Sequence, residues 1–151
     1  MSKAVWGPIY WAFIHTLAEK LKPEHFTEQR ESLFNILTKM CDTLPCPECR
    51  NHANSNLRTA KLNLIKTREH FIDFLYEFHN RVNRQTGKPA YPKERLGLYS
   101  TYSLEKVVQQ FLRLYGSSSR NSRMMADVFH RQQMYRWLVT YFRANNGAFN
   151  R

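Results

Sequence analysis

Apolar residues recur at helical spacing along most of the chain, and this periodicity constrains the fold more than any other feature. The clearest run has apolar side chains at positions i, i+3, i+4, i+7, i+8 and i+11: Leu33, Ile36, Leu37, Met40, Cys41 and Leu44. Such spacing places the side chains on one face of an α-helix. Alternating runs between tight turns, which would indicate strands, are weak throughout. The sequence therefore predicts an all-α protein.

Prolines and glycines divide this pattern into separate helices. Pro23 ends or kinks a first helix, and Pro45 stops the second, because proline cannot continue the hydrogen-bonding pattern. Pro47 suits the first position of a third helix, which is predicted to run to about Arg58. The Gly-Lys-Pro sequence at 87–89 is a stop signal for a fourth helix. Together these signals predict four or five core helices.

The last third of the chain reads as a helical extension. Residues 90–102 are predicted to form a loop, and Ser103 is expected to cap the helix that follows. The Gly-Ser-Ser-Ser run at 116–119 is the strongest linker signal, ahead of one last long helix. We also expect the second helix to be capped near Thr27. At 151 residues the chain has room for one domain with a core.

The chain is basic, with 23 Lys and Arg against 12 Asp and Glu and a formal net charge of +11. This balance permits binding to nucleic acid, to an acidic partner or to an anionic cofactor, and equally a solvated basic surface. No apolar run approaches the about 20 residues that span a bilayer. The N-terminal residues lack the apolar core of a signal peptide. We therefore expect no membrane association and a cytoplasmic location.

The cysteine residues are candidates for redox chemistry or metal binding. Only three occur, Cys41, Cys46 and Cys49, and the last two form a Cys-Pro-Glu-Cys motif. With Cys46 as the N-cap of the third helix, both sulfurs lie near the positive end of the helix dipole, which stabilises a thiolate. The spacing also brings the two Cα atoms within disulfide range, about 5–6 Å. Because cytosolic disulfides are usually transient and catalytic, the pair suits reversible oxidation.

Two other interpretations of the pair can be weighed. A thioredoxin-like site would follow a strand, and no strand signal precedes this motif. A zinc site could use Cys41, Cys46, Cys49 and His52, in a zinc-stapled basic helical protein that binds nucleic acid. Against zinc, Cys41 lies on the apolar stripe, where a cysteine usually packs as a small hydrophobe. The zinc alternative stays open on these residues alone.

Three blocks of sequence bear on the interpretation of the cysteine pair. They run from Trp6 to His15, from Leu44 to Arg50, and from His79 to Asn83 with residues 87–89. In order and spacing they closely resemble the Erv/ALR family of FAD-dependent sulfhydryl oxidases, over roughly residues 4–91. The chain is most similar to the forms carried by large nucleocytoplasmic DNA viruses such as iridoviruses.

The resemblance implies the architecture. A four-helix bundle with a short fifth helix, over residues 1–102, would bind FAD. A helical C-terminal extension, residues 103–151, would pack on the core or on a dimer partner. The protein would form a non-covalent homodimer, in the host cytoplasm or the virion if it is viral.

The resemblance also implies the site. Thiols would attack the disulfide at Cys46, Cys49 would lie next to the flavin, and electrons would pass through FAD to oxygen, giving hydrogen peroxide. No metal is expected. The residues expected to bind FAD are Gly7, Trp11, His15, Cys49, His52, His79, Asn80, Val82, Asn83 and Lys88.

The expected substrates are protein thiols, and no nucleic acid is required. Many family members carry a second cysteine pair that shuttles electrons, and this chain has none. Substrates would therefore reach Cys46 directly or through a separate dithiol carrier, and we favour the carrier.

Overall fold

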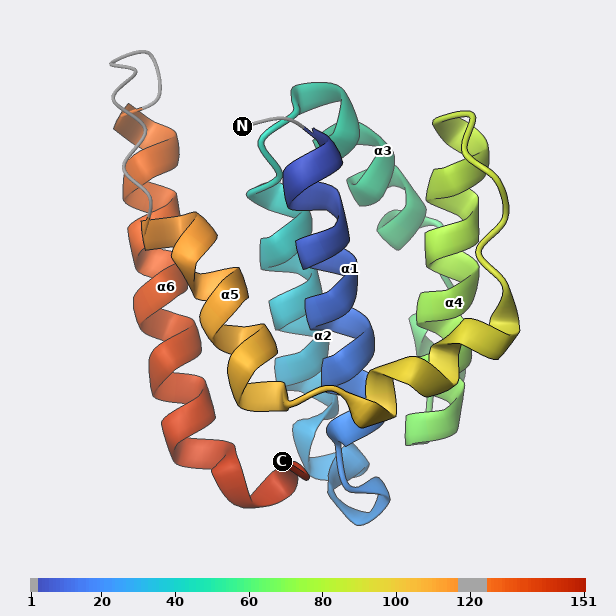
Figure 1. The fold of residues 1–151 in the computed structure, drawn as a ribbon, viewed down its shortest axis with the longest axis vertical. Helices are drawn as coiled ribbons and strands as arrows, with labels where there is room; N and C mark the ends of the chain where they lie inside the picture. The colour runs from blue at the N-terminus through green and yellow to red at the C-terminus, as the bar shows by residue number, and fades with distance from the viewer. Residues whose placement is uncertain (1–2, 117–124) are drawn as a thin grey trace.

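Six α-helices form the part of the chain that the computed structural model describes, residues 3–116 and 125–151 (Figure 1). They are α1 (Lys3–Lys20), α2 (Phe26–Asp42), α3 (Pro47–Arg58), α4 (Arg68–Gln85), α5 (Leu104–Gly116) and α6 (Met125–Asn145). Short 3₁₀ segments are η1 (Pro23–His25), η2 (Leu62–Leu64), η3 (Lys93–Thr101) and η5 (Asn146–Ala148). Within these ranges no strand forms, and one isolated antiparallel bridge joins Leu21 to Phe149. The all-α prediction is confirmed.

Helix α1 is the central element of the bundle. It packs against α4 on one side and α5 on the other, and η3 crosses it, while α3 packs against α2 and α4 (Figure 1). Phe13 of α1 and Phe111 of α5 are fully buried and stack with ring centroids 4.0 Å apart. Burying two whole phenyl rings against each other makes this contact a main source of α1–α5 stability.

The C-terminal helices pack on the same chain. Tyr141 of α6 donates a hydrogen bond of 2.6 Å to Gln29 of α2. The Lys39 ammonium of α2 lies 4.9 Å from the centre of the Trp137 ring of α6. Helices α5 and α6 therefore cover the side of α1 and α2 that is opposite α4 (Figure 1). Of the predicted linker 116–119, Gly116 ends α5 and residues 117–119 lie outside the described part of the chain.

Several predicted boundaries are confirmed and one cap is wrong. Helix α3 begins at Pro47 and ends at Arg58, and Ser103 Oγ accepts the Lys106 N–H at the start of α5, at 3.4 Å. Helix α2 begins at Phe26, before the expected cap near Thr27. The side chain of its N-cap residue, His25, makes no capping hydrogen bond to the backbone and pairs with the Glu28 carboxylate at 3.0 Å. The 3₁₀ turn η1 leads directly into α2, so the backbone enters this helix without a side-chain cap.

The predicted loop at 90–102 is also wrong in part, since η3 occupies most of it. Leu96 and Tyr99, three residues apart, are both buried. In a 3₁₀ helix such positions align on one side, so a segment without a 3.6-residue period still covers α1.

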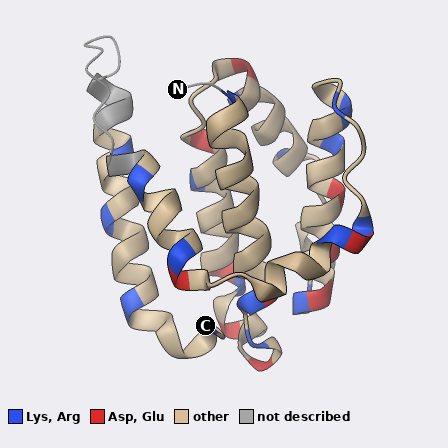
Figure 2. Cartoon of the chain, viewed as in Figure 1, with Lys and Arg blue, Asp and Glu red and all other residues tan. Residues whose placement is uncertain are grey.

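Charged residues are spread over the surface rather than gathered into one block. Lys and Arg are spaced along the outside of α5 and α6, with few acidic residues between them (Figure 2). Across the described residues, no helix combines the length and apolar character that crossing a membrane requires.

Candidate functional site

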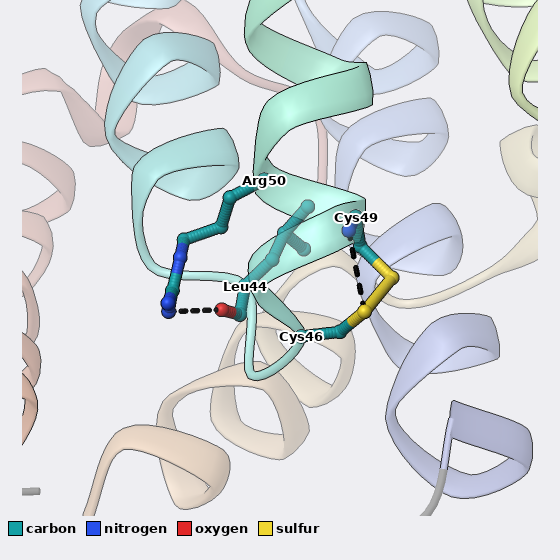
Figure 3. Close-up of a disulfide and its surroundings, with 4 residues drawn as sticks. All are labelled: Leu44, Cys46, Cys49 and Arg50. Carbon is teal, nitrogen blue, oxygen red and sulfur yellow. Dashed lines mark hydrogen bonds between the residues drawn. A yellow bond between two sulfur atoms is a disulfide. The ribbon is translucent and has the colours of Figure 1, made fainter.

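The Cys-Pro-Glu-Cys motif forms the turn into α3 and holds a disulfide between Cys46 and Cys49, with Cα atoms 5.1 Å apart (Figure 3). Cys46 is the N-cap, and its Sγ accepts the backbone N–H of Cys49 at 3.2 Å. Pro47 takes the first helical position, where its missing N–H costs nothing. The predicted local structure is confirmed, and it places both sulfurs at the positive end of the α3 dipole.

A pocket lies beside the disulfide, between α1, α2, α3 and α4. The space between its lining residues amounts to about 720 Å³ when the part open to solvent is included. Its walls are largely apolar, and include Trp11, Met40, Leu44 and Phe78. Cys49 lines the pocket, whereas Cys46 is not among the lining residues. The disulfide therefore joins a sulfur at the pocket wall to a sulfur beyond it.

Most of the residues predicted to bind FAD border this one pocket. Those that line it are Gly7, Trp11, Cys49, His52, Val82, Asn83 and Lys88. The structure thus gathers side chains from α1, α3 and α4, and from the segment after α4, around a common space. Direct contact of these residues with FAD stays a prediction.

The other three predicted residues, His15, His79 and Asn80, are buried and do not line the pocket. The His79 ring stacks on Trp11 with centroids 3.8 Å apart, and His15 Nε2 lies 2.9 Å from His79 Nδ1. Since a neutral imidazole has one donor and one acceptor nitrogen, two neutral rings can share this hydrogen bond. These histidines therefore support the wall from within the bundle.

Burial keeps both imidazoles neutral at physiological pH. Desolvation, and then the nearby His79, lower the pKa of His15 to about 3. Desolvation, and then the positive charge of Lys88, lower the pKa of His79 to about 4. A charged imidazole here would lose its hydration without a carboxylate to compensate, which explains the direction of both shifts.

The two predicted asparagines form hydrogen bonds with the segment that follows α4. Asn80 Oδ1 accepts the Tyr91 N–H at 2.6 Å, and Asn80 Nδ2 donates to the Tyr91 carbonyl at 3.4 Å. Asn83 Nδ2 donates to the Pro89 carbonyl at 3.1 Å, and its own carbonyl accepts the Lys88 N–H at 2.8 Å. These bonds hold Lys88 at the rim of the pocket.

The residues considered as zinc ligands do not come together as a metal site in the structure. Among the described residues, no three His, Cys, Asp or Glu side chains form a group that could hold a metal ion. Cys46 and Cys49 bond to each other, and Cys41 is a buried free thiol that lines the pocket. Burial, and then the neighbouring Asp42, raise the pKa of Cys41 to about 12, so this thiol stays protonated. A buried structural role for Cys41 agrees with its place on the apolar stripe.

Several pocket residues were not predicted as site residues. Leu37 and Met40 of α2 line the pocket, although the apolar stripe assigned them only to the core. Leu44 of the same stripe and Phe78 of α4 also line the pocket. Periodicity shows that a side chain faces inward and does not show whether it meets another side chain or a cavity.

Comparison with known proteins gives a consistent result. The model described as the Erv1 / Alr family matches residues 8–101. The chain is 32% identical over 90 residues to the FAD-linked sulfhydryl oxidase ERV1 of Arabidopsis thaliana, covering 60% of this chain and 47% of that protein. It is 29% identical over 86 residues to the putative FAD-linked sulfhydryl oxidase 096R of Invertebrate iridescent virus 3, covering 56% and 58%.

A third relative is the FAD-linked sulfhydryl oxidase of African swine fever virus, 31% identical over 83 residues, covering 55% of this chain and 69% of the relative. The predicted similarity to proteins of large DNA viruses is therefore confirmed. The chain spans about half the length of the first relatives. Helices α5 and α6 lie outside the matched range.

Proposed function

The chain belongs to the Erv1/Alr family, and on this premise we propose that it is an FAD-dependent sulfhydryl oxidase that forms disulfides in protein substrates. The observation that carries the proposal is the position of Cys49, which lines a largely apolar pocket and is bonded to a Cys46 outside that lining. A dithiol arranged in this way can accept electrons on one side and deliver them on the other.

The residues around the pocket fit a flat aromatic cofactor. A flavin needs apolar walls and a few polar groups that fix its orientation. Trp11 and Val82 supply wall, and His52, Asn83 and Lys88 supply polar or positively charged groups at the same space. When bound, FAD supplies a two-electron acceptor that oxygen can reoxidise, giving hydrogen peroxide.

The chain's own chemistry is thiol–disulfide exchange. A substrate thiolate attacks Cys46 Sγ, the Cys46–Cys49 bond breaks, and a mixed disulfide forms on Cys46. Cys49 leaves as a thiolate, which the N-terminus of α3 stabilises. A second substrate thiolate then attacks the substrate sulfur of the mixed disulfide and releases Cys46. The substrate leaves with a disulfide, and its two electrons remain on the Cys46–Cys49 dithiol.

Two further parts of the proposal concern partners. The chain has no cysteine pair besides Cys46 and Cys49, so a separate dithiol protein delivers electrons to Cys46. The protein also works as a non-covalent homodimer. Its remaining cysteine, Cys41, is buried and is not available for a bridge between subunits.

Purified protein tests the proposal. We expect a yellow preparation that retains FAD through gel filtration and consumes oxygen when a reduced, unfolded protein is added as substrate. Cys46→Ser should keep the bound FAD and lose oxidation of the protein substrate. A protein that stays colourless after incubation with FAD, and consumes no oxygen, would contradict the proposal.

A further inference from the structure

The side chain of Arg50 in α3 hydrogen-bonds to the turn at residues 44–46, which carries Cys46. Arg50 Nη1 donates a hydrogen bond of 2.8 Å to the Leu44 carbonyl (Figure 3). The Arg50 backbone N–H donates to the Cys46 carbonyl at 3.0 Å. The side chain thus reaches back across the motif, from the residue after Cys49 to the residue two before Cys46. This contact closes the segment 44–50 into a ring that includes Cys46 and Cys49, and the disulfide projects on the side of the turn opposite the Arg50 side chain (Figure 3).

The turn has few backbone hydrogen-bond donors of its own, so a side-chain donor can stabilise it. Pro45 and Pro47 flank Cys46, and neither has a backbone N–H to donate. Arg50 is partly buried, and none of the ion pairs formed by the described residues involves it. Its guanidinium therefore offers a charge-assisted hydrogen bond to the turn, which is stronger than a bond between neutral groups. Leu44, whose carbonyl accepts this bond, also lines the pocket next to Cys49.

We propose that Arg50 is a positioning residue that sets the reduction potential of the Cys46–Cys49 pair by holding the 44–46 turn against α3. This inference rests on the proposed function, since it concerns the redox pair of that reaction. In the exchange, two substrate thiols become one disulfide, and the Cys46–Cys49 disulfide becomes two thiols. Arg50 is unchanged in both states and acts only on the position of Cys46.

The direction of the effect follows from conformational entropy. Reduction frees Cys46 from Cys49, and without Arg50 the turn would gain freedom in the reduced state alone. Holding the turn keeps the Cys46 thiol close to Cys49, which favours closure of the disulfide. Loss of the hydrogen bond should therefore favour the reduced form by about tenfold, which raises the potential by about 30 mV for this two-electron couple.

The test measures the dithiol itself. Under anaerobic conditions, FAD-loaded protein is equilibrated in glutathione buffers of graded ratio, quenched with acid, unfolded and alkylated, and the labelled thiols are counted by mass spectrometry. Arg50→Met keeps the apolar stem and removes the donors, and should shift the equilibrium about tenfold toward the reduced form. Arg50→Lys, which keeps one charged donor, should restore most of the wild-type potential. Arg58→Met is the matched control, because Arg58 is an exposed arginine on the same helix.

Two results would overturn the inference: an unchanged potential in folded Arg50→Met, or equal shifts in Arg50→Met and Arg58→Met. A lower melting temperature without a change in potential would likewise assign Arg50 a purely structural role. If Arg50→Met does not fold, Arg50→Gln, whose side chain is too short to span the turn, should show the same shift. The readout needs no turnover, so absent oxidase activity would contradict the proposed function while leaving the result for Arg50 intact.

Discussion

The Trp11 indole and the His79 imidazole stack face to face, with ring centroids 3.8 Å apart and planes 9° apart. Trp11 comes from α1 and lines the pocket, while His79 comes from α4 and does not line it. His15, one turn after Trp11, shares a hydrogen bond of 2.9 Å with His79. The wall of the pocket therefore rests on a buried pair of neutral imidazoles that joins two helices.

Replacing Trp11 should affect both the pocket and the bundle. Trp11→Ala removes the ring that packs on His79 and Phe78, and it leaves a cavity beside the pocket. We expect loss of bound FAD during gel filtration and a decrease of about 3 kcal/mol in the free energy of unfolding, measured in guanidinium chloride. Val5→Ala is the control, because Val5 on the same helix is 52% exposed and should change stability little. Full retention of FAD by Trp11→Ala would show that this wall does not hold the cofactor.

The two buried histidines should make the protein sensitive to acid. Their pKa values in the fold are lowered to about 3 and about 4, whereas an unfolded histidine titrates near 6.5. Below pH 6.5 the unfolded state binds protons that the folded state does not, so stability falls as pH falls. The full free energy of unfolding is therefore retained above pH 6.5. At pH 5 each histidine should lower the free energy of unfolding by about 2 kcal/mol.

Denaturant unfolding at pH 7.5 and pH 5.0 checks this prediction. His15→Gln keeps a polar atom that can reach His79 and removes one titrating group. Its loss of stability between the two pH values should be smaller than that of the wild type by about 2 kcal/mol. His25→Gln is the control, since His25 is a partly exposed histidine outside the bundle core. Equal pH dependence in the wild type and His15→Gln would refute the assignment.

A buried hydrogen bond contributes to the attachment of α6 to the bundle. Tyr141 Oη donates to Gln29 Oε1 at 2.6 Å, and Gln29 Nε2 donates to Asn145 Oδ1 at 2.9 Å. Tyr141→Phe leaves the buried Gln29 oxygen without this donor, so we expect a loss of about 1–2 kcal/mol in unfolding free energy. Tyr135→Phe makes the same chemical change at a side chain that is 40% exposed, and should be nearly neutral. Similar losses in both variants would argue against a role for this bond.

The local structure of the dithiol could be predicted from sequence because it depends on neighbouring residues. Pro47 has a fixed φ and no N–H, so it favours the first position of a helix and leaves Cys46 as the cap. The start and end of α3 follow from the same local rules. The resemblance to a known family predicted that residues far apart in the sequence, such as Trp11 and Asn83, lie at one site. Local rules do not predict such groupings.

The remaining features depend on tertiary contacts. The hydrogen bond between His15 and His79 joins residues 64 positions apart, and no local pattern indicates it. The 3₁₀ segment η3 packs on α1 and buries Leu96 and Tyr99, although its sequence lacks helical periodicity. Met40 packs in the core and also lines the pocket, and only the placement of four helices decides this.

The central claim is that Cys49 is the sulfur through which electrons leave the dithiol. Anaerobic addition of dithiothreitol to FAD-loaded protein, followed by the visible absorbance of the flavin, tests this claim most directly. We predict that the wild type bleaches and that Cys49→Ser, with an equal content of FAD, stays yellow. Bleaching of Cys49→Ser at the wild-type rate would contradict the account.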